Sequence, residues 1–187
     1  KNKLEASGEG KVIFSYEESY GYMLGDYVRD KDAVTAALLL TEMAAWYAGQ
    51  GMTLYDALQK CFEKYGYYGE KTLNLVMPGL DGLKKMADLM AGLREHPPVE
   101  IAGVAVEQRK DYKDGSVVRV SDGSRSAMEL SGSNVLRYEM ADGTSVIVRP
   151  SGTEPKVKVY ILANGADRAV CEEKAARYAV WAESLRG

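Results

Sequence analysis

Histidine and cysteine are scarce in this sequence of 187 residues, which contains one histidine, His96, and two cysteines, Cys61 and Cys171. A single histidine and the absence of a Cys-x-x-Cys motif argue against a zinc site. Each cysteine lies in a helical pattern without a nearby partner, so we expect two buried free thiols in a reducing compartment rather than a disulfide. We interpret His96, in the last turn of a predicted helix, as a surface residue rather than a catalytic base.

Long apolar runs and an excess of positive charge are also missing. No run approaches the roughly 20 residues of a membrane span, so we expect no membrane partner. The net charge of −3 argues against a globally basic surface for nucleic acid, although a local basic patch remains compatible with it. No apolar segment follows the first lysines, so the start of the chain is not a signal peptide, and we expect a cytoplasmic protein. Apolar residues make up 46% of the chain, which is enough for a real core.

The first half of the chain is patterned mainly as helices. Residues 11–15 predict a short strand. The segment between Asp32 and Gly49 predicts a helix capped by Asp32, and because it is apolar on nearly every face, we expect it to be buried. Thr53 and Asp56 form a capping-box pattern at the start of a second helix.

Pro97 and Pro98 mark the clearest change of pattern. Before them come a predicted strand over residues 67–77 and a helix over residues 81–96. We expect this helix to turn four apolar side chains inward: Leu83, Ala87, Met90 and Leu93. Strand patterns dominate after the two prolines, so we predict two domains, residues 1–97 and residues 98–187.

Short strands and turns organise the second half. Three turn dipeptides separate the strand patterns: Asp114-Gly115, Asp122-Gly123 and Asp142-Gly143. The strand after residue 155 alternates, with Val157, Val159 and Ile161 on one face. The closing helix presents a face made of Val170, Lys174, Tyr178, Trp181 and Leu185. The predicted fold class is α/β, helix-rich with few strands, followed by an α+β domain in which a small antiparallel sheet packs on the C-terminal helix.

A polar loop, "RPSGTEP", lies between two of the predicted strands. Arg149 offers a planar fork of donors that matches phosphate oxygens, and Ser151 and Thr153 add hydroxyl donors. Gly152 permits a backbone shape in which successive N–H groups face one side and bind an anion. Lys158 adds a point charge on the following strand. These donors suit a phosphate group, but the same residues also suit a tight hairpin turn, and composition leaves both interpretations open.

A second polar loop, "YEESYGY", follows the strand at residues 11–15. Glu17, Glu18 and Ser19 come directly after that strand, where α/β sheets place ligand contacts. Carboxylates flanked by tyrosines suit a sugar, because the carboxylates accept hydrogen bonds from hydroxyls and the rings cover the sugar faces. The alternative is a solvated acidic loop, with Lys31 farther along as an ordinary surface charge.

Five motifs occur together and in order: "EESYG", "RDKD", "FEKYGYYGE", "SGSNVLRY" and "RPSGTEPKVKVY". In this order they resemble the alpha-D-phosphohexomutases, with the phosphoglucomutase/phosphomannomutase branch nearest, and the resemblance covers essentially the whole chain. The family has four domains. This chain resembles the later part of the third and all of the fourth, which has a TATA-box-binding-protein-like fold. Residues 1–4 have the pattern of a helix already under way, so we expect a piece of a longer protein.

The resemblance implies roles for individual residues. Glu17 and Ser19 would face the sugar hydroxyls, and Lys31 would face the bound phosphosugar. A second set would hold the phosphate that is not transferred: Arg149, Ser151, Gly152, Thr153 and Lys158. Because the sugar binds in two orientations in this family, that loop would accept the phosphate of either end. Relatives often have glycine where this chain has Tyr16, so the backbone of the sugar loop is expected to differ.

Two loops of the family are missing from these residues. One is the Thr-Ala-Ser-His-Asn-Pro loop, whose serine carries the phosphoryl group, and the other is the Asp-Gly-Asp-x-Asp loop for magnesium. The stretch "SDGSRS" at residues 121–126 lacks three carboxylates for a hard cation. We therefore expect no catalytic residue and no metal ligand in this chain, with Mg²⁺ and a hexose 1,6-bisphosphate intermediate acting in the full-length protein.

The reaction implied for the full-length protein interconverts hexose 1-phosphate and hexose 6-phosphate through a bisphosphate. The expected partners are a phosphosugar and the N-terminal domains of the same protein. The chain alone is expected to bind phosphosugar weakly without turnover and to cover exposed apolar helix faces by forming a homodimer. The alternatives are a phosphomannomutase or phosphopentomutase, a non-catalytic phosphosugar-binding module, or a protein-interaction domain whose loop is only a turn.

Overall fold

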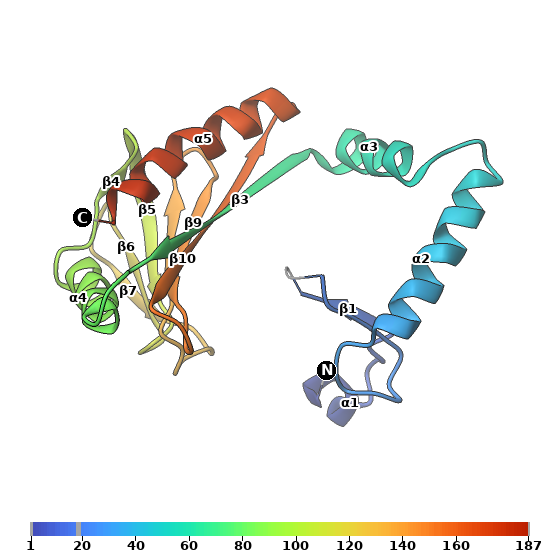
Figure 1. The fold of residues 1–187 in the computed structure, drawn as a ribbon, viewed down its shortest axis with the longest axis horizontal. Coiled ribbons are helices and arrows are strands. Elements are labelled where there is room, and N and C mark those ends of the chain that lie inside the picture. The colour runs from blue at the N-terminus through green and yellow to red at the C-terminus, as the bar shows by residue number, and fades with distance from the viewer. Residues whose placement is uncertain (1, 18–19, 187) are drawn as a thin grey trace. The chain divides into compact units, whose positions relative to one another are not determined.

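The computed structural model describes residues 2–17 and 20–186, which form two compact units (Figure 1). The first unit comprises Lys1–Cys61 and the second Phe62–Gly187, and helix α3 (Leu54–Tyr65) crosses the division. The boundary predicted after residue 97 differs from this division. The reason is that strand β3 (Tyr67–Val76) pairs along its whole length with strand β10 (Lys156–Gly165) and so belongs to the sheet of the second unit.

The first unit begins with a short helix and a two-stranded hairpin. Helix α1 (Asn2–Ser7) precedes strands β1 (Phe14–Tyr16) and β2 (Tyr22–Leu24), which pair antiparallel. Helix α2 (Ala33–Ala48) follows, and the Asp32 carboxylate caps it as predicted by accepting a hydrogen bond from Val34 N at 2.9 Å.

The predicted capping box at the start of α3 is confirmed. The carboxylate of Asp56 accepts a hydrogen bond from Thr53 N at 2.8 Å, and Asp56 N donates back to Thr53 Oγ1 at 3.1 Å. These two reciprocal bonds satisfy backbone donors that a helix start otherwise leaves unpaired.

The expectation that α2 is buried is wrong for this chain. None of its residues is buried, and Leu38 and Trp46 remain 57% and 63% exposed. Of the residues 4–17 and 20–61, for which burial is described, Ala57 alone is buried. A helix that is apolar on all sides needs neighbours on all sides, and the described part of the first unit does not supply them.

The second unit is an eight-stranded antiparallel sheet with two helices. The strand order is β3-β10-β9-β8-β5-β6-β7, with β4 paired to β5. The remaining elements are α4 (Gly82–Glu95), β4 (Glu100–Ile101), β5 (Val104–Asp111), β6 (Ser116–Arg119), β7 (Arg125–Ala127), β8 (Leu136–Met140), β9 (Ser145–Pro150) and α5 (Arg168–Ser184). Helix α5 lies across the sheet in Figure 1. The fold class predicted for the second half, a sheet packed on a C-terminal helix, is confirmed.

One face of this sheet forms the core. Val157, Val159 and Ile161 of β10 are fully buried, as the alternation predicted, and the side chains between them belong to the opposite face. Of the four α4 side chains predicted to face the core, Met90 and Leu93 are buried, whereas Leu83 and Ala87 are exposed. Along α5, the buried residues are mostly small: Cys171, Ala175, Tyr178, Ala179 and Ala182. Only Tyr178 of that set was predicted.

Both cysteines are free, as predicted, but only Cys171 is buried and Cys61 is exposed. His96 follows α4 as its C-terminal cap residue and is exposed, which agrees with its interpretation as a surface residue. Among the described residues, no helix is both long enough and apolar enough to cross a membrane.

The uneven burial predicts uneven local stability. Amide protons of α2 should exchange with solvent well before those of β10, because opening α2 exposes no buried side chain whereas opening β10 exposes fully buried valines. Hydrogen exchange followed by mass spectrometry measures this directly. Equal protection of residues 33–48 and residues 156–165 would contradict the assignment of the stable core to the second unit.

Candidate functional site

The polar loop after β9 is held between two strands with fully buried anchors. Val148 precedes Arg149 on β9, and Val157 lies on β10 just beyond the loop; neither side chain is exposed. At the base of the loop, Ser151 N donates to Lys156 O at 2.8 Å. The loop is therefore short and its two ends are fixed by the core of the second unit.

Arg149 and Lys158 lie directly opposite each other in the β9–β10 ladder. Direct partners point to the same face, and like charges in that position destabilise a sheet. The neighbouring Lys156 is neutralised by an ion pair with Glu154. Neither Arg149 nor Lys158 forms an ion pair within the described residues, although Lys158 Nζ lies 5.9 Å from the centre of the Tyr160 ring. An anion bound here would relieve the repulsion between the two cations.

The backbone N–H groups expected to face one side of this loop are partly engaged within the loop itself. Ser151 Oγ accepts long hydrogen bonds from Thr153 N at 3.4 Å and from Glu154 N at 3.3 Å. Since Ser151 N is engaged with Lys156, only Gly152 keeps a backbone N–H without a partner among the described residues from Ser151 to Thr153. The Ser151 hydroxyl therefore shapes the loop from within in this structure.

Nothing in the fold of the second unit explains glycine at position 152. Its φ is not positive, and a Cβ at this position would meet no atom within 4 Å. Neither backbone torsion nor packing therefore requires glycine here. Open space beside an available N–H group is what the close approach of a ligand needs.

The far side of the loop rests on the start of α4. Met77 N donates to Pro155 O at 2.8 Å. A Cβ on Gly82 would lie 2.1 Å from Met77 O and 2.9 Å from Pro155 Cβ. Glycine is therefore required where the end of β3, the first turn of α4 and the loop meet. The sequence pattern did not single out Gly82, because it lies in an ordinary helix start.

The first unit brings two of the predicted sugar-binding residues together. Lys31 Nζ lies 3.1 Å from Glu17 Oε1, and both side chains are largely exposed. They line a cavity of about 300 Å³ with Ser15, Gly21 and Asp30 among the other lining residues. Glu18 and Ser19 lie outside the described residues.

Gly21 makes this ion pair possible, although no sequence pattern marks this glycine as a site residue. A Cβ at Gly21 would lie 2.2 Å from Lys31 Cδ and 2.5 Å from Glu17 Oε1. Gly21 O also accepts a hydrogen bond from Glu17 N at 2.9 Å, which closes the hairpin loop. Tyr20, just before it, has a φ of 64°, an uncommon conformation for a residue other than glycine. The hairpin turn thus places Glu17 against Lys31.

Asp32 fixes the backbone next to Lys31. Its N–H donates to Tyr22 O on β2 at 2.9 Å, which ties the start of α2 to the hairpin. Its carboxylate accepts a hydrogen bond from the Tyr27 hydroxyl at 2.6 Å. That bond, followed by the bond from Val34 N, lowers the pKa of Asp32 below its usual value, so the cap stays ionised at neutral pH.

Comparison with known proteins follows the same division of the chain. Residues 1–65 match the family model described as "Phosphoglucomutase/phosphomannomutase, alpha/beta/alpha domain III", and residues 74–178 match "Phosphoglucomutase/phosphomannomutase, C-terminal domain". The chain belongs to the phosphoglucomutase/phosphomannomutase family. This membership confirms the predicted fold class, α/β followed by α+β, and the two matched regions correspond to domain III and the C-terminal domain of the family.

Two relatives show the extent of the similarity. The chain is 37% identical over 150 residues to a phosphoglucomutase of Staphylococcus aureus (strain N315) and 38% identical over 152 residues to one of Staphylococcus haemolyticus. These matches cover 80% and 81% of this chain but only 27% and 28% of the two relatives. A solution structure of a Cytophaga hutchinsonii protein aligns with 65% of this chain and 89% of its own, at a TM-score of 0.25 and 12% identity.

The contact between the start of α4 and the loop at residues 151–155 can be tested with a pair of glycine substitutions on α4. Gly82→Ala should lower the free energy of unfolding by about 1–3 kcal/mol, the range typical of an overpacked site. Gly92→Ala is the matched control, because a Cβ there meets nothing within 4 Å and alanine favours a helix by about 0.5–1 kcal/mol. Urea denaturation measures both, and an unchanged stability of Gly82→Ala would show that the close contact with Met77 and Pro155 does not exist in solution.

Proposed function

We propose that this chain is the substrate-positioning part of a phosphoglucomutase-type enzyme that interconverts hexose 1-phosphate and hexose 6-phosphate through a bisphosphate. The observation that carries the proposal is the pair formed by Arg149 and Lys158, held opposite each other beside a glycine that the fold does not require. Membership of the phosphoglucomutase/phosphomannomutase family supports it. A cytoplasmic location fits such an enzyme of sugar metabolism.

In this proposal, the loop around Arg149 holds the phosphate that is not being transferred. The guanidinium group donates two parallel hydrogen bonds to phosphate oxygens, and Lys158 adds a point charge. The Gly152 N–H donates a further bond, and the hydroxyls of Ser151 and Thr153 are within the same loop. Since these donors recognise a phosphate and not the sugar ring, the same loop serves both orientations of the substrate.

Glu17 and Lys31 serve the sugar in this proposal. Glu17 accepts hydrogen bonds from sugar hydroxyls, and Lys31 donates to the same ligand, so the two side chains exchange their mutual ion pair for contacts with substrate. Both are largely exposed, which makes that exchange inexpensive. The resemblance to the family extends the same role to Ser19, which lies outside the described residues.

Chemistry on the phosphoryl group falls to other parts of the full-length protein in this proposal. No group of three His, Cys, Asp or Glu side chains that could hold a metal ion occurs in residues 2–17 and 20–186. We therefore assign no step to a metal bound by these residues. Phosphoryl transfer depends on positioning and on neutralisation of charge, and this chain supplies the positioning.

Arg149 tests the phosphate assignment. Arg149→Ala should weaken binding of glucose 1-phosphate to the chain by about 10- to 150-fold, because hydrogen bonds to charged groups contribute about 1.5–3 kcal/mol and about 1.4 kcal/mol is tenfold in affinity. Arg149→Lys should recover only part of this loss, since lysine lacks the fork. NMR titration measures the affinity, with Arg119→Ala as the control because Arg119 is an exposed arginine on β6, three strands away. An unchanged affinity for glucose 1-phosphate in Arg149→Ala, followed at the amides of residues 149–158, would show that the loop is only a turn.

Glu17 tests the sugar assignment separately. Glu17→Gln keeps the size of the side chain but accepts weaker hydrogen bonds, so glucose 1-phosphate binding should weaken about fivefold. Inorganic phosphate, which has no sugar hydroxyls, should bind with unchanged affinity. Glu42→Gln, an exposed substitution on α2, is the control. An equal loss of both ligands in Glu17→Gln would place Glu17 at the phosphate and contradict the division of roles.

A further inference from the structure

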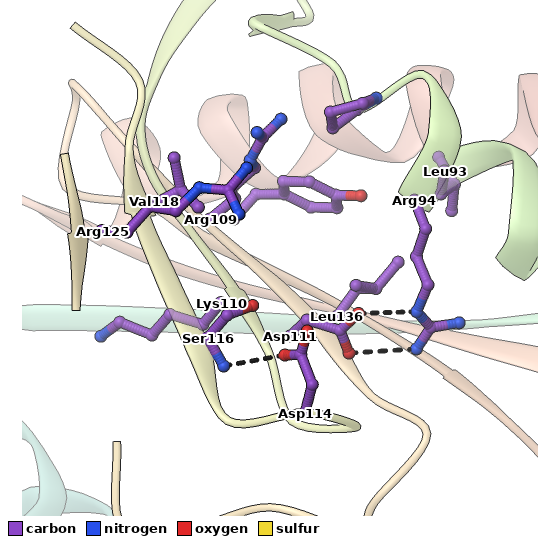
Figure 2. A pocket seen from close by; sticks show the side chains of 12 residues that line it. Leu93, Arg94, Arg109, Lys110, Asp111, Asp114, Ser116, Val118, Arg125 and Leu136 are labelled. Atoms are coloured by element: carbon purple, nitrogen blue, oxygen red, sulfur yellow. Dashed lines mark hydrogen bonds and ion pairs between the residues drawn. The ribbon is translucent and has the colours of Figure 1, made fainter. Parts of the chain in front are cut away.

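A cavity of about 260 Å³ lies over strands β5, β6 and β8 of the second unit, beside the end of α4 (Figure 2). Four of its lining residues form one row across the sheet. Tyr138 of β8 pairs with Arg109 of β5, Arg109 with Val118 of β6, and Val118 with Arg125 of β7. Because direct cross-strand partners point to the same face, this row presents two arginines and a tyrosine to the same side of the sheet.

Only some of the charges around this cavity are neutralised. Arg94 of α4 forms a two-pronged ion pair with Asp111, with distances of 2.7 and 3.1 Å, drawn as dashed lines in Figure 2. Asp114 accepts a hydrogen bond from Ser116 N at 2.8 Å. Arg109 and Arg125 form no ion pair in the part of the chain that the structure describes. Asp114 also forms no ion pair in that part of the chain, so the cavity carries two unpaired guanidinium groups and one unpaired carboxylate, a net excess of positive charge.

Tyr138 adds a buried donor to this row. It is 1% exposed, and its hydroxyl has no hydrogen-bond partner among the described residues. A buried polar group without a partner destabilises the protein, and an acceptor oxygen on a ligand would remove this cost by accepting a hydrogen bond from the hydroxyl. Burial also raises the pKa of the Tyr138 phenol, so the group keeps its proton at neutral pH and remains a donor.

We propose that this cavity binds the phosphate group of a small phosphate monoester through Arg109, Arg125 and the Tyr138 hydroxyl. Guanidinium forks match phosphate oxygens in geometry and charge. Leu93, Pro97 and Leu136 line the same cavity and provide an apolar wall for a short organic body. The volume restricts the ligand to a small metabolite.

This site is separate from the loop of Arg149 and does not rest on the function proposed above. Tyr138 and Val148 are both buried on the helix-covered face of the sheet, and Arg109 pairs with Tyr138. Arg149 directly follows Val148 along β9, so its side chain belongs to the opposite face. One protein can therefore hold two phosphate groups on the two faces of one sheet.

The test is an NMR titration of the 187-residue chain with inorganic phosphate, followed through the backbone amides. The Arg149→Gln variant serves as the background, because it removes the loop site and isolates this cavity. Saturable shifts of amides in β5, β6 and β7 are expected with phosphate and not with chloride at equal ionic strength. Absence of saturation, or an equal response to chloride, would overturn the proposal whatever the fate of the loop site.

Substitutions then identify the donors. In the same background, Arg109→Gln and Arg125→Gln should each weaken phosphate binding by about tenfold or more. Tyr138→Phe should also weaken it while the thermal midpoint of the free protein stays equal or rises, since the removed hydroxyl has no partner. The matched control is Arg119→Gln, which removes the same charge from β6 at the residue after Val118, on the opposite face. A loss in Arg119→Gln as large as in Arg125→Gln would show unspecific charge attraction and overturn the proposal.

Discussion

The pairing of β9 with β10 is the interaction on which the candidate phosphate site depends. Fully buried valines on both strands, Val148 and Val157 nearest the loop, fix the two strands in one register. That register places Arg149 opposite Lys158 and leaves a short loop between them. The buried valines on one face of the sheet thus keep two mutually repelling cations, Arg149 and Lys158, opposite each other on the other face.

The two units use different means to position their polar residues. In the second unit, a rigid sheet and the close contact at Gly82 hold the loop from both ends. In the first unit, a small hairpin brings Glu17 to Lys31, and Gly21 and Asp32 provide the space and the backbone ties. This second arrangement has almost no buried side chain beneath it among the described residues, so we expect it to open more readily than the sheet.

The sequence predicted the features that follow from local pattern. The alternation in β10 and the caps at Asp32 and Thr53 identified their elements correctly, and the motifs identified the family. The sequence could not place the division between the units, because Pro97 and Pro98 mark a change of pattern while the pairing of β3 with β10 is a long-range contact. It also failed for α2, since an apolar pattern shows that a helix needs cover but not whether the same chain supplies it.

The candidate site was predictable in composition but not in geometry. Arg149 and Lys158 stood out by type, whereas their cross-strand pairing depends on register. Gly21 and Gly82 gave no local signal, because each is required by the way the chain folds back on it, Gly21 by Glu17 and Lys31 and Gly82 by Met77 and Pro155. The backbone N–H groups expected to face an anion are partly engaged because the Ser151 hydroxyl accepts hydrogen bonds within the loop, a competition that composition does not reveal.

The most direct test of the phosphate assignment is the response of one backbone group, the Gly152 N–H, to glucose 1-phosphate. In an NMR titration of the unmodified chain, we expect the Gly152 amide proton to shift with the ligand in a saturable way, and more than the amides of α5. A Gly152 resonance that stays in place while the chain binds the ligand elsewhere would contradict the assignment of this loop as the phosphate site.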